Sequence, residues 1–211
     1  MTEENRYTIT FSTWNEVAAL YQDKFMDLDL YNDSYDMFCN LLTTANARIL
    51  DIGCGPGNIS RYLLLKQPGL HIHGTDIAPN MIALAKTNNP AATFEVLDSR
   101  EIDRLETKFN GIISGFCIPY LSKKDCDKFI KDCYNLLETG GILYLSFVEG
   151  NHDQSGYKTA STGDKTYFYY YESSGVVTEL KKQHFEIIQT VQKEYSRQPN
   201  DEVHTIIIAG K

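Results

Sequence analysis

The chain has 211 residues, of which 42% are hydrophobic and 23% charged, and its formal net charge is -8. This size and composition are typical of one soluble domain with its own core, and the acidic balance argues against nucleic acid as the main partner. No apolar run approaches the roughly 20 residues that span a bilayer and the first residues lack the apolar centre of a signal peptide, so we expect a cytoplasmic protein that binds no membrane.

Five cysteines are spread along the chain, and no two of them form a Cys-x-x-Cys pair. An odd number without that spacing indicates neither a disulfide framework nor a zinc site. His71 and His73 share one face of a predicted strand, where packing explains them better than metal binding. We therefore expect no metal site.

Residues 1–47 are predicted to form a helical cap. The segment Thr13–Glu16 has the form of a capping box, and apolar residues follow it at helical spacing: Val17, Leu20, Tyr21 and Phe25. A second amphipathic helix is predicted from about Asp33. We expect both helices mainly to cover a sheet, with Trp14 and Tyr21 as their contacts if they close over a ligand.

A strand and a glycine-rich turn follow, over residues 48–60. The apolar residues around Asp51 predict a strand that is buried on both faces. A carboxylate is costly to bury without hydrogen-bond partners, so Asp51 indicates a polar ligand or nearby backbone amides. Gly53, Gly55 and Gly57 allow a sharp turn and a close approach to a ligand, and the next helix directs its free amides to the same place. This geometry suits an anionic or carboxylate-bearing cofactor.

Strands and helices then alternate. The predicted strands are His71–Asp76, Thr93–Asp98, Gly111–Phe116 and Ile142–Phe147, and the predicted helices begin at Asn58, Pro79 and Ser122. Elements at this spacing form right-handed βαβ crossovers. They predict an α/β fold with a doubly wound, mostly parallel sheet.

Two β-type runs, Phe185–Tyr195 and Val203–Ala209, end the sequence. The turn-prone link between them, Ser196–Glu202, is too short for a crossover helix, so we expect an antiparallel hairpin. The polar segment before the runs centres on Tyr167–Tyr171. These tyrosines are predicted either to adjoin a ligand pocket or to form an added strand or the surface of a homodimer.

Taken together, these features resemble the class I S-adenosylmethionine-dependent methyltransferases. The most specific feature is Leu-Asp-Ile-Gly-Cys-Gly-Pro-Gly at residues 50–57, which is similar to the family's first motif almost letter for letter. The resemblance implies a Rossmann-like, seven-stranded, mostly parallel sheet with a C-terminal antiparallel hairpin. It implies a single domain, 1–211, made of a helical cap 1–47, a cofactor-binding core 48–147, a substrate-side insertion 148–185 and the hairpin 186–211.

The resemblance also implies S-adenosyl-L-methionine as the cofactor and a role for each residue around it. The glycine turn would approach the methionine part, Asp76 would accept the ribose hydroxyls, and Ile77 would lie against the adenine. Asp98 and the Ser99 amide would bind the adenine edge, and the end of the fourth strand would offer a carbonyl to the ammonium group. The implied cofactor-binding residues are Tyr21, Asp51, Gly53, Cys54, Gly55, Gly57, Asp76, Ile77, Asp98, Ser99, Gly115 and Phe116.

Structural roles remain open for two of these acids. Asp98, with Ser99, is also placed to cap the following helix. Asp51 would either hold polar groups or water near the cofactor or be oriented by the amides of the loop. In both cases the carboxylate would still shape the predicted site.

The methyl acceptor is expected to be a small molecule, methylated on O, N or C. Residues 115–121 lack the Asn-Pro-Pro-Tyr or Asp-Pro-Pro-Tyr signature that resembles amino-methylating enzymes acting on nucleobases or glutamine. They also lack the acidic cluster of magnesium-dependent catechol-type enzymes. The cofactor half is similar to that of the ubiquinone/menaquinone-biosynthesis C-methyltransferases. Tyr120, Tyr169 and His184 are predicted to line the acceptor pocket, and His152 and His184 are the candidate bases.

Two other functions remain open. An NAD(P)-dependent oxidoreductase also has a glycine-rich turn after a strand, although Asn58 replaces the third glycine of its fingerprint and the terminal hairpin is left unexplained. A non-catalytic module that binds S-adenosylmethionine would keep the turn but lack an acceptor site.

Overall fold

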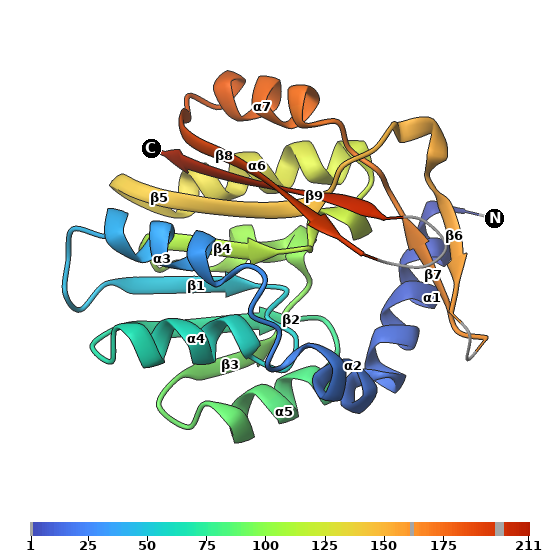
Figure 1. The fold of residues 1–211 in the computed structure, drawn as a ribbon, viewed down its shortest axis with the longest axis horizontal. Coiled ribbons are helices and arrows are strands. Elements are labelled where there is room, and N and C mark those ends of the chain that lie inside the picture. Colours follow the sequence, from blue (N-terminus) through green and yellow to red (C-terminus); the bar gives the residue numbers. More distant parts are fainter. Residues whose placement is uncertain (1, 161–162, 197–200) are drawn as a thin grey trace.

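A seven-stranded sheet organises the molecule (Figure 1). The computed structural model describes residues 2–160, 163–196 and 201–211, and within them the sheet has the strand order β3-β2-β1-β4-β5-β9-β8. Strands β1 to β5 run parallel, and β9 lies antiparallel between β5 and β8. Its strands are β1 Arg48–Ile52, β2 His71–Asp76, β3 Thr93–Val96, β4 Phe109–Gly115, β5 Leu137–Val148, β8 Glu186–Tyr195 and β9 Glu202–Gly210. The predicted fold class is confirmed.

Helices cover both faces of this sheet (Figure 1). The α-helices are α1 Glu3–Glu16, α2 Ala18–Phe25, α3 Asn32–Leu41, α4 Asn58–Lys66, α5 Pro79–Asn88, α6 Lys123–Leu136 and α7 Ser173–Lys182, and the 3-10 helices are η1 Ser99–Arg104, η2 Ile118–Tyr120 and η3 His152–Gln154. Helices α3 and α4 pack against Ile49 and Ile113, whereas α6 and α7 pack against Leu50 and Ile112. Successive residues of β1 and β4 are thus buried on opposite faces, as expected for central parallel strands. Among the described helices, none combines the length and apolarity needed to cross a bilayer.

The helix predicted behind Thr13 is present as α2, but its predicted start is wrong, and a separate helix, α1, precedes it. Helix α1 begins ten residues before Thr13, at Glu3, where Thr2 Oγ1 accepts from the Asn5 amide at 3.3 Å and two glutamates occupy the first turn. Thr13 lies in the last turn of α1, and its hydroxyl donates to the Lys165 carbonyl at 2.7 Å. The helix predicted near Asp33 is present as α3.

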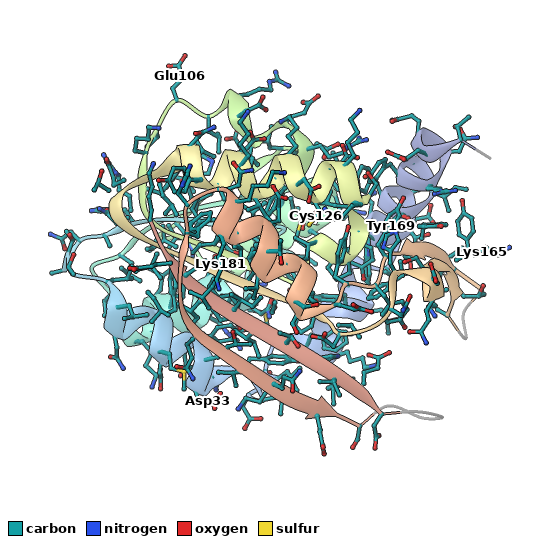
Figure 2. All side chains as sticks on the ribbon, turned by 90° about the horizontal axis from the view of Figure 1, so that it is seen from above. Asp33, Glu106, Cys126, Lys165, Tyr169 and Lys181 are labelled. Carbon is teal, nitrogen blue, oxygen red and sulfur yellow. The ribbon has the colours of Figure 1, made fainter. Side chains whose placement is uncertain are left out.

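Helix α7 was not predicted. Its N-cap, Glu172, makes no side-chain cap, and its sequence begins with Ser, Ser and Gly and then two valines, which are weak helix formers. Burial of Val176 and Leu180, four residues apart, against α6 offsets that propensity. Figure 2 shows α7, which carries Lys181, beside α6 on this face of the sheet.

Two predicted strand ends shift. Strand β3 stops at Val96, and β5 begins at Leu137, so the predicted loop at 138–141 belongs to that strand. The predicted terminal hairpin is confirmed by the antiparallel register of β8 and β9. Residues 197–200 of its predicted turn lie outside the described residues.

The tyrosine-rich segment forms an added strand, which was one of its open interpretations. Strands β6 (Gly156–Thr159) and β7 (Lys165–Phe168) pair antiparallel in a separate two-stranded sheet. Strand β7 lies along α1: Thr10 Oγ1 accepts from the Tyr167 amide at 2.8 Å, and the Arg6 guanidinium lies 4.4 Å from the Tyr167 ring centroid. Helix α1 and this hairpin therefore form one wall beside the carboxyl ends of the parallel strands (Figure 1).

Gly74 in β2 provides a test of this packing. A Cβ on Gly74 would lie 2.4 Å from Phe94 Cδ1 and 3.2 Å from Cys54 Sγ. A Cβ on Gly175, which lies on the exposed side of α7, would meet nothing within 4 Å. We expect Gly74→Ala to lower the free energy of unfolding by about 1–3 kcal/mol through overpacking. Gly175→Ala, the matched control, should raise it by about 0.5–1 kcal/mol through helix propensity. Urea denaturation measures both, and equal stabilities would contradict the close packing at Gly74.

Candidate active site

The turn after β1 is fixed to the neighbouring strand β2. The amides of Gly53 and Cys54 both donate to the Thr75 carbonyl, at 2.8 and 2.9 Å. Gly53, Gly55 and Gly57 adopt φ values of +69°, +54° and +81°, which other residues rarely tolerate. Helix α4 begins directly after the turn, so its free first-turn amides and positive dipole end face the same region.

Asp76, at the end of β2, closes this turn from the other side. Its Oδ2 accepts from the Gly55 amide and its Oδ1 from the Ala78 amide, each at 2.9 Å. Burial raises the pKa of the Asp76 carboxyl, and the two amide hydrogen bonds oppose that effect. Both carboxylate oxygens therefore hold the backbone around the site.

Asp51 lies fully buried behind the turn. Its Oδ2 accepts from the Ser60 hydroxyl at 2.6 Å, while its Oδ1 has no hydrogen-bond partner among the described residues. Burial raises the pKa of Asp51 to about 7, against the hydrogen bond from Ser60. An unpaired buried carboxylate oxygen is costly, which is typical of a functional site rather than of a core.

A cavity of about 1110 Å³ opens at the carboxyl ends of the parallel strands. It lies between these strand ends, the N-terminal helices and the β6–β7 hairpin. The predicted site residues that line it are Tyr21, Gly53, Cys54, Gly55, Asp76, Ile77, Ser99, Gly115, Phe116 and Tyr120. Residues distant in sequence are thus brought to one hollow, as the carboxyl edge of a parallel sheet favours.

An aromatic wall closes one side of the cavity. The Trp14 ring centroid lies 5.5 Å from that of Tyr21 and 5.4 Å from that of Tyr120, and Tyr120 lies 5.6 Å from Phe168 of β7. A Cβ on Gly55 would be 3.6 Å from Tyr21 Cε1, so Tyr21 lies directly over the glycine turn. Trp14 and Tyr21 therefore occupy the predicted position of a cover.

Asp98 does not line the cavity, although Ser99 beside it does. Its Oδ1 accepts from the Arg100 amide at 2.9 Å and so caps η1, and its Oδ2 accepts from the Arg100 guanidinium at 2.6 and 2.9 Å. The capping role that the sequence left open is thus present. An adenine amine that bound Asp98 would share its carboxylate with the Arg100 guanidinium.

Besides Asp98 and the buried Asp51, four predicted residues lie outside the cavity lining. Gly57 is covered by Asn89, whose Nδ2 donates to the Gly57 carbonyl at 3.0 Å. Tyr169 packs in the core toward α1 and α6 (Figure 2), and His152 stacks on it with ring centroids 6.1 Å apart. His184 follows α7 and lies 6.4 Å from the Tyr134 ring. The structure does not bring Tyr169, His152 or His184 to the predicted acceptor pocket.

Sequence reasoning missed a polar cluster that does line the cavity, formed by Tyr31, His204 and Glu202. The Tyr31 hydroxyl lies 2.6 Å from His204 Nδ1, and His204 Nε2 lies 3.3 Å from Glu202 Oε2. Tyr31 and His204 are 173 residues apart, so no local motif joins them. One signal in the sequence could have located His204. It lies two residues before Ile206 and four before Ile208, which face α3, and side chains at this spacing lie on the same face of a strand.

Comparisons with known proteins agree with this geometry. The model of the family described as "Methyltransferase domain" matches residues 49–141. The chain is 28% identical, over 145 residues, to a putative methyltransferase 235L of Invertebrate iridescent virus 6, an alignment that covers 68% of this chain and 52% of that protein. It is 34% identical, over 105 residues, to a malonyl-[acyl-carrier protein] O-methyltransferase of Bacillus cereus, covering 49% of this chain and 38% of that protein. The chain thus spans about half or less of the length of these two relatives.

One solved structure resembles the whole fold. It is the 1,6-didemethyltoxoflavin-N1-methyltransferase of Burkholderia thailandensis, with bound 1,6-didemethyltoxoflavin and S-adenosylhomocysteine; the TM-score is 0.74 at 16% identity, and the match covers 100% of this chain and 91% of that one. This likeness concerns the fold alone. With the matched motif region, the relatives and the strand order together, residues 49–141 carry a methyltransferase domain, and the chain has the fold of the class I S-adenosylmethionine-dependent methyltransferases.

Proposed function

We propose that this protein transfers the methyl group of S-adenosylmethionine to a small-molecule acceptor bound in the cavity. The observation that carries the proposal is the Asp76 carboxylate, which accepts from the Gly55 amide and faces the same cavity as the glycine turn. An acid at this position, beside a glycine-rich turn at the carboxyl edge of a parallel sheet, is the arrangement that binds the ribose of nucleoside cofactors.

The residues around the turn suit this cofactor. Asp76 keeps acceptor capacity for ribose hydroxyls, because an ionised carboxylate offers about four lone-pair sites and two are used within the fold. The Gly53 and Gly55 amides already donate within the fold, so these glycines would contribute close approach rather than donors. The first-turn amides of α4 would then bind the carboxylate of the cofactor.

The remaining predicted contacts follow from position. Ile77 lines the cavity next to Asp76, where it would lie against the adenine, and the end of β4 at Gly115 and Phe116 would receive the ammonium group. The unpaired Asp51 oxygen lies behind the turn. A positive group of the bound cofactor nearby would favour the ionised form of Asp51.

When bound, S-adenosylmethionine supplies a methyl group on a sulfonium whose departure needs no further activation. The protein then has to hold the acceptor atom in line with that methyl carbon and to exclude water. Trp14, Tyr21, Tyr120 and Phe168 would do both, because their rings form a continuous wall over the cavity. A cavity of about 1110 Å³ holds a nucleoside cofactor together with a second small molecule.

Calorimetry with S-adenosylmethionine and S-adenosylhomocysteine tests the cofactor assignment. We expect the wild type to bind both, and Asp76→Asn to weaken both by about tenfold or more, since a hydrogen bond to a charged group contributes about 1.5–3 kcal/mol. Asp103→Asn is the matched control, because Asp103 is a surface partner of Lys128 at 3.1 Å, away from the cavity. Binding of NADH in place of these compounds would favour the oxidoreductase instead.

The pH dependence of stability tests the buried carboxyl. The pKa of Asp51 is raised from 3.8 to about 7, so the folded protein holds this proton more tightly than the unfolded chain does. Stability from this group is fully present below about pH 4 and is lost as the pH rises to about 7.

Asp51→Asn removes this titration. One pKa unit corresponds to about 1.4 kcal/mol. From about pH 4 to about pH 7, the free energy of unfolding of the wild type should therefore decrease by a few kcal/mol more than that of the variant. Urea denaturation at several pH values, without ligand, measures the difference. Parallel curves for the two proteins would mean that Asp51 is ionised in the folded state.

A further inference from the structure

The cluster of Tyr31, His204 and Glu202 is built at the edge of the sheet where the cofactor would bind. Tyr31 directly precedes α3, and its carbonyl accepts from the Ser34 hydroxyl at 2.6 Å. Strand β9 runs antiparallel to β5, so its first residues, Glu202 and His204, lie at the carboxyl end of β5. Chain segments far apart in sequence thus meet at one end of the cavity.

Aromatic rings hold His204 in place within this cluster. The Tyr195 ring stacks on it with centroids 5.0 Å apart and planes at 16°, and the Phe116 ring lies 4.8 Å away, nearly perpendicular. Tyr31 is also 5.3 Å from Phe116. Tyr31 and His204 are each only 5% exposed, and both are among the residues that line the cavity.

Phe116 joins this cluster to the cofactor side of the cavity. It follows Gly115 at the end of β4 and has a φ of +56°, which is strained for a residue with a side chain. Its amide is held by Ser146, donating to the carbonyl at 3.0 Å and lying 3.2 Å from the hydroxyl oxygen. Backbone strain that the surroundings maintain is typical of a functional site.

The hydrogen bonds define the direction in which a proton can move. Burial raises the pKa of the Tyr31 phenol well above its usual range, so Tyr31 keeps its proton. The Glu202 carboxylate can only accept, so His204 Nε2 carries the hydrogen that faces it and His204 Nδ1 accepts from the Tyr31 hydroxyl. Tyr31 can therefore receive a proton from the cavity only as it passes its own to His204.

We propose that the cluster is the general base of the methyl transfer and that the acceptor is a neutral or cationic molecule with a proton-bearing nitrogen or oxygen nucleophile. The inference rests on the proposed function. The acceptor atom bonds to the methyl carbon as the carbon–sulfur bond breaks, its proton moves to the Tyr31 oxygen, and the Tyr31 proton moves to His204 Nδ1. The imidazolium formed lies beside Glu202, which acts as a positioning residue. S-adenosylhomocysteine leaves, and His204 returns its proton to solvent.

The charge of the cavity supports the acceptor class. Its described lining contains five acids, Asp76, Glu149, Asp164, Asp201 and Glu202, and two lysines, Lys24 and Lys158. Glu149, Asp201 and Glu202 all lie on the strand ends or the β8–β9 connection near His204. A carboxylate acceptor would be repelled there, and it would not need a base.

Titratable and charged groups face His204 from several elements. They are Tyr31 before α3, Tyr195 on β8, Glu202 on its own strand, and Lys193, which lies opposite His204 in the β8–β9 register. Lys193 Nζ is 2.5 Å from Asp33 Oδ2, so its charge is compensated. Glu202 is therefore the group best placed to stabilise the imidazolium.

The acceptor class is tested with three probes of similar shape: phenol, aniline and benzoate. We expect the wild type to transfer radiolabelled methyl from S-adenosylmethionine to phenol or aniline and not to benzoate. Calorimetry in the presence of S-adenosylhomocysteine should show that phenol or aniline binds more tightly than benzoate. Methylation or tight binding of benzoate in preference to the other two would overturn the assigned class.

The base is tested with Tyr31→Phe and His204→Gln on the best of these probes. We expect kcat to fall by about 100-fold or more, the usual contribution of a general base, while the affinity for S-adenosylhomocysteine changes less than about twofold. The matched controls are Tyr62→Phe and His73→Gln: Tyr62 donates to Asp36 and His73 pairs with Glu95, both outside the cavity. Both controls should keep wild-type kcat.

A second acceptor separates base catalysis from a structural role. The hydroxyl of 4-nitrophenol is already ionised in mildly alkaline buffer. The acidic cavity should slow this anion equally in all variants, so relative to the wild type on the same acceptor the Tyr31 and His204 variants should lose far less rate than they do with phenol. Glu202→Gln should shift the acidic limb of the pH–rate profile with phenol. Equal losses with phenol and 4-nitrophenol would overturn the base assignment and leave the methyltransferase function intact, whereas failure of the wild type to bind S-adenosylmethionine would overturn both.

Discussion

The hydrogen bonds between the turn after β1 and the end of β2 are the constraint on which the site depends. Thr75 accepts from two turn amides, and the Asp76 carboxylate accepts from a third, that of Gly55. These bonds fix a turn that has three residues at positive φ and would otherwise be free to move. Because α4 starts where the turn ends, they also set the direction of its N-terminus. The carboxylate expected to bind the ribose therefore shapes the turn as well.

The cover over the cavity is anchored to the same region through α5. Asn80, in its first turn, donates from its amide and side chain to Asn15 of α1, both at 2.8 Å. Asn88, in its last turn, donates to Gln22 of α2 at 2.7 Å and to the Pro56 carbonyl in the turn at 2.8 Å. Helices α1 and α2 are thus linked to the glycine turn by side chains of one helix.

The parts of the fold that sequence predicts are those with local causes. Contacts between residues close in sequence determine strand β2, the start of α4 and the Ser122 cap of α6. The predicted N-terminal cap was misplaced because Thr13 and Glu16, which have the spacing of a capping box, lie in the last turn of α1. There the Thr13 hydroxyl donates to the Lys165 carbonyl, and Glu16 accepts from the Ser12 hydroxyl at 2.9 Å. Helix α7 was missed because burial against α6, a long-range effect, overrides its weak propensity.

The candidate site shows the same difference between features with local causes and features that depend on long-range contacts. The proposed cofactor half is encoded in a few contiguous stretches, the turn at 50–57 and the strand end at Asp76, so the sequence indicates it. The proposed acceptor half is assembled by contacts such as that of Tyr31 with His204, which form only when β9 inserts between β5 and β8. His152, chosen because it follows a predicted strand, and His184, chosen because it precedes the final hairpin, therefore lie outside the cavity lining. Because strand alternation decides which face His204 occupies, a shift of one residue in the β9 register would leave the glycine turn intact and remove the histidine from the cavity.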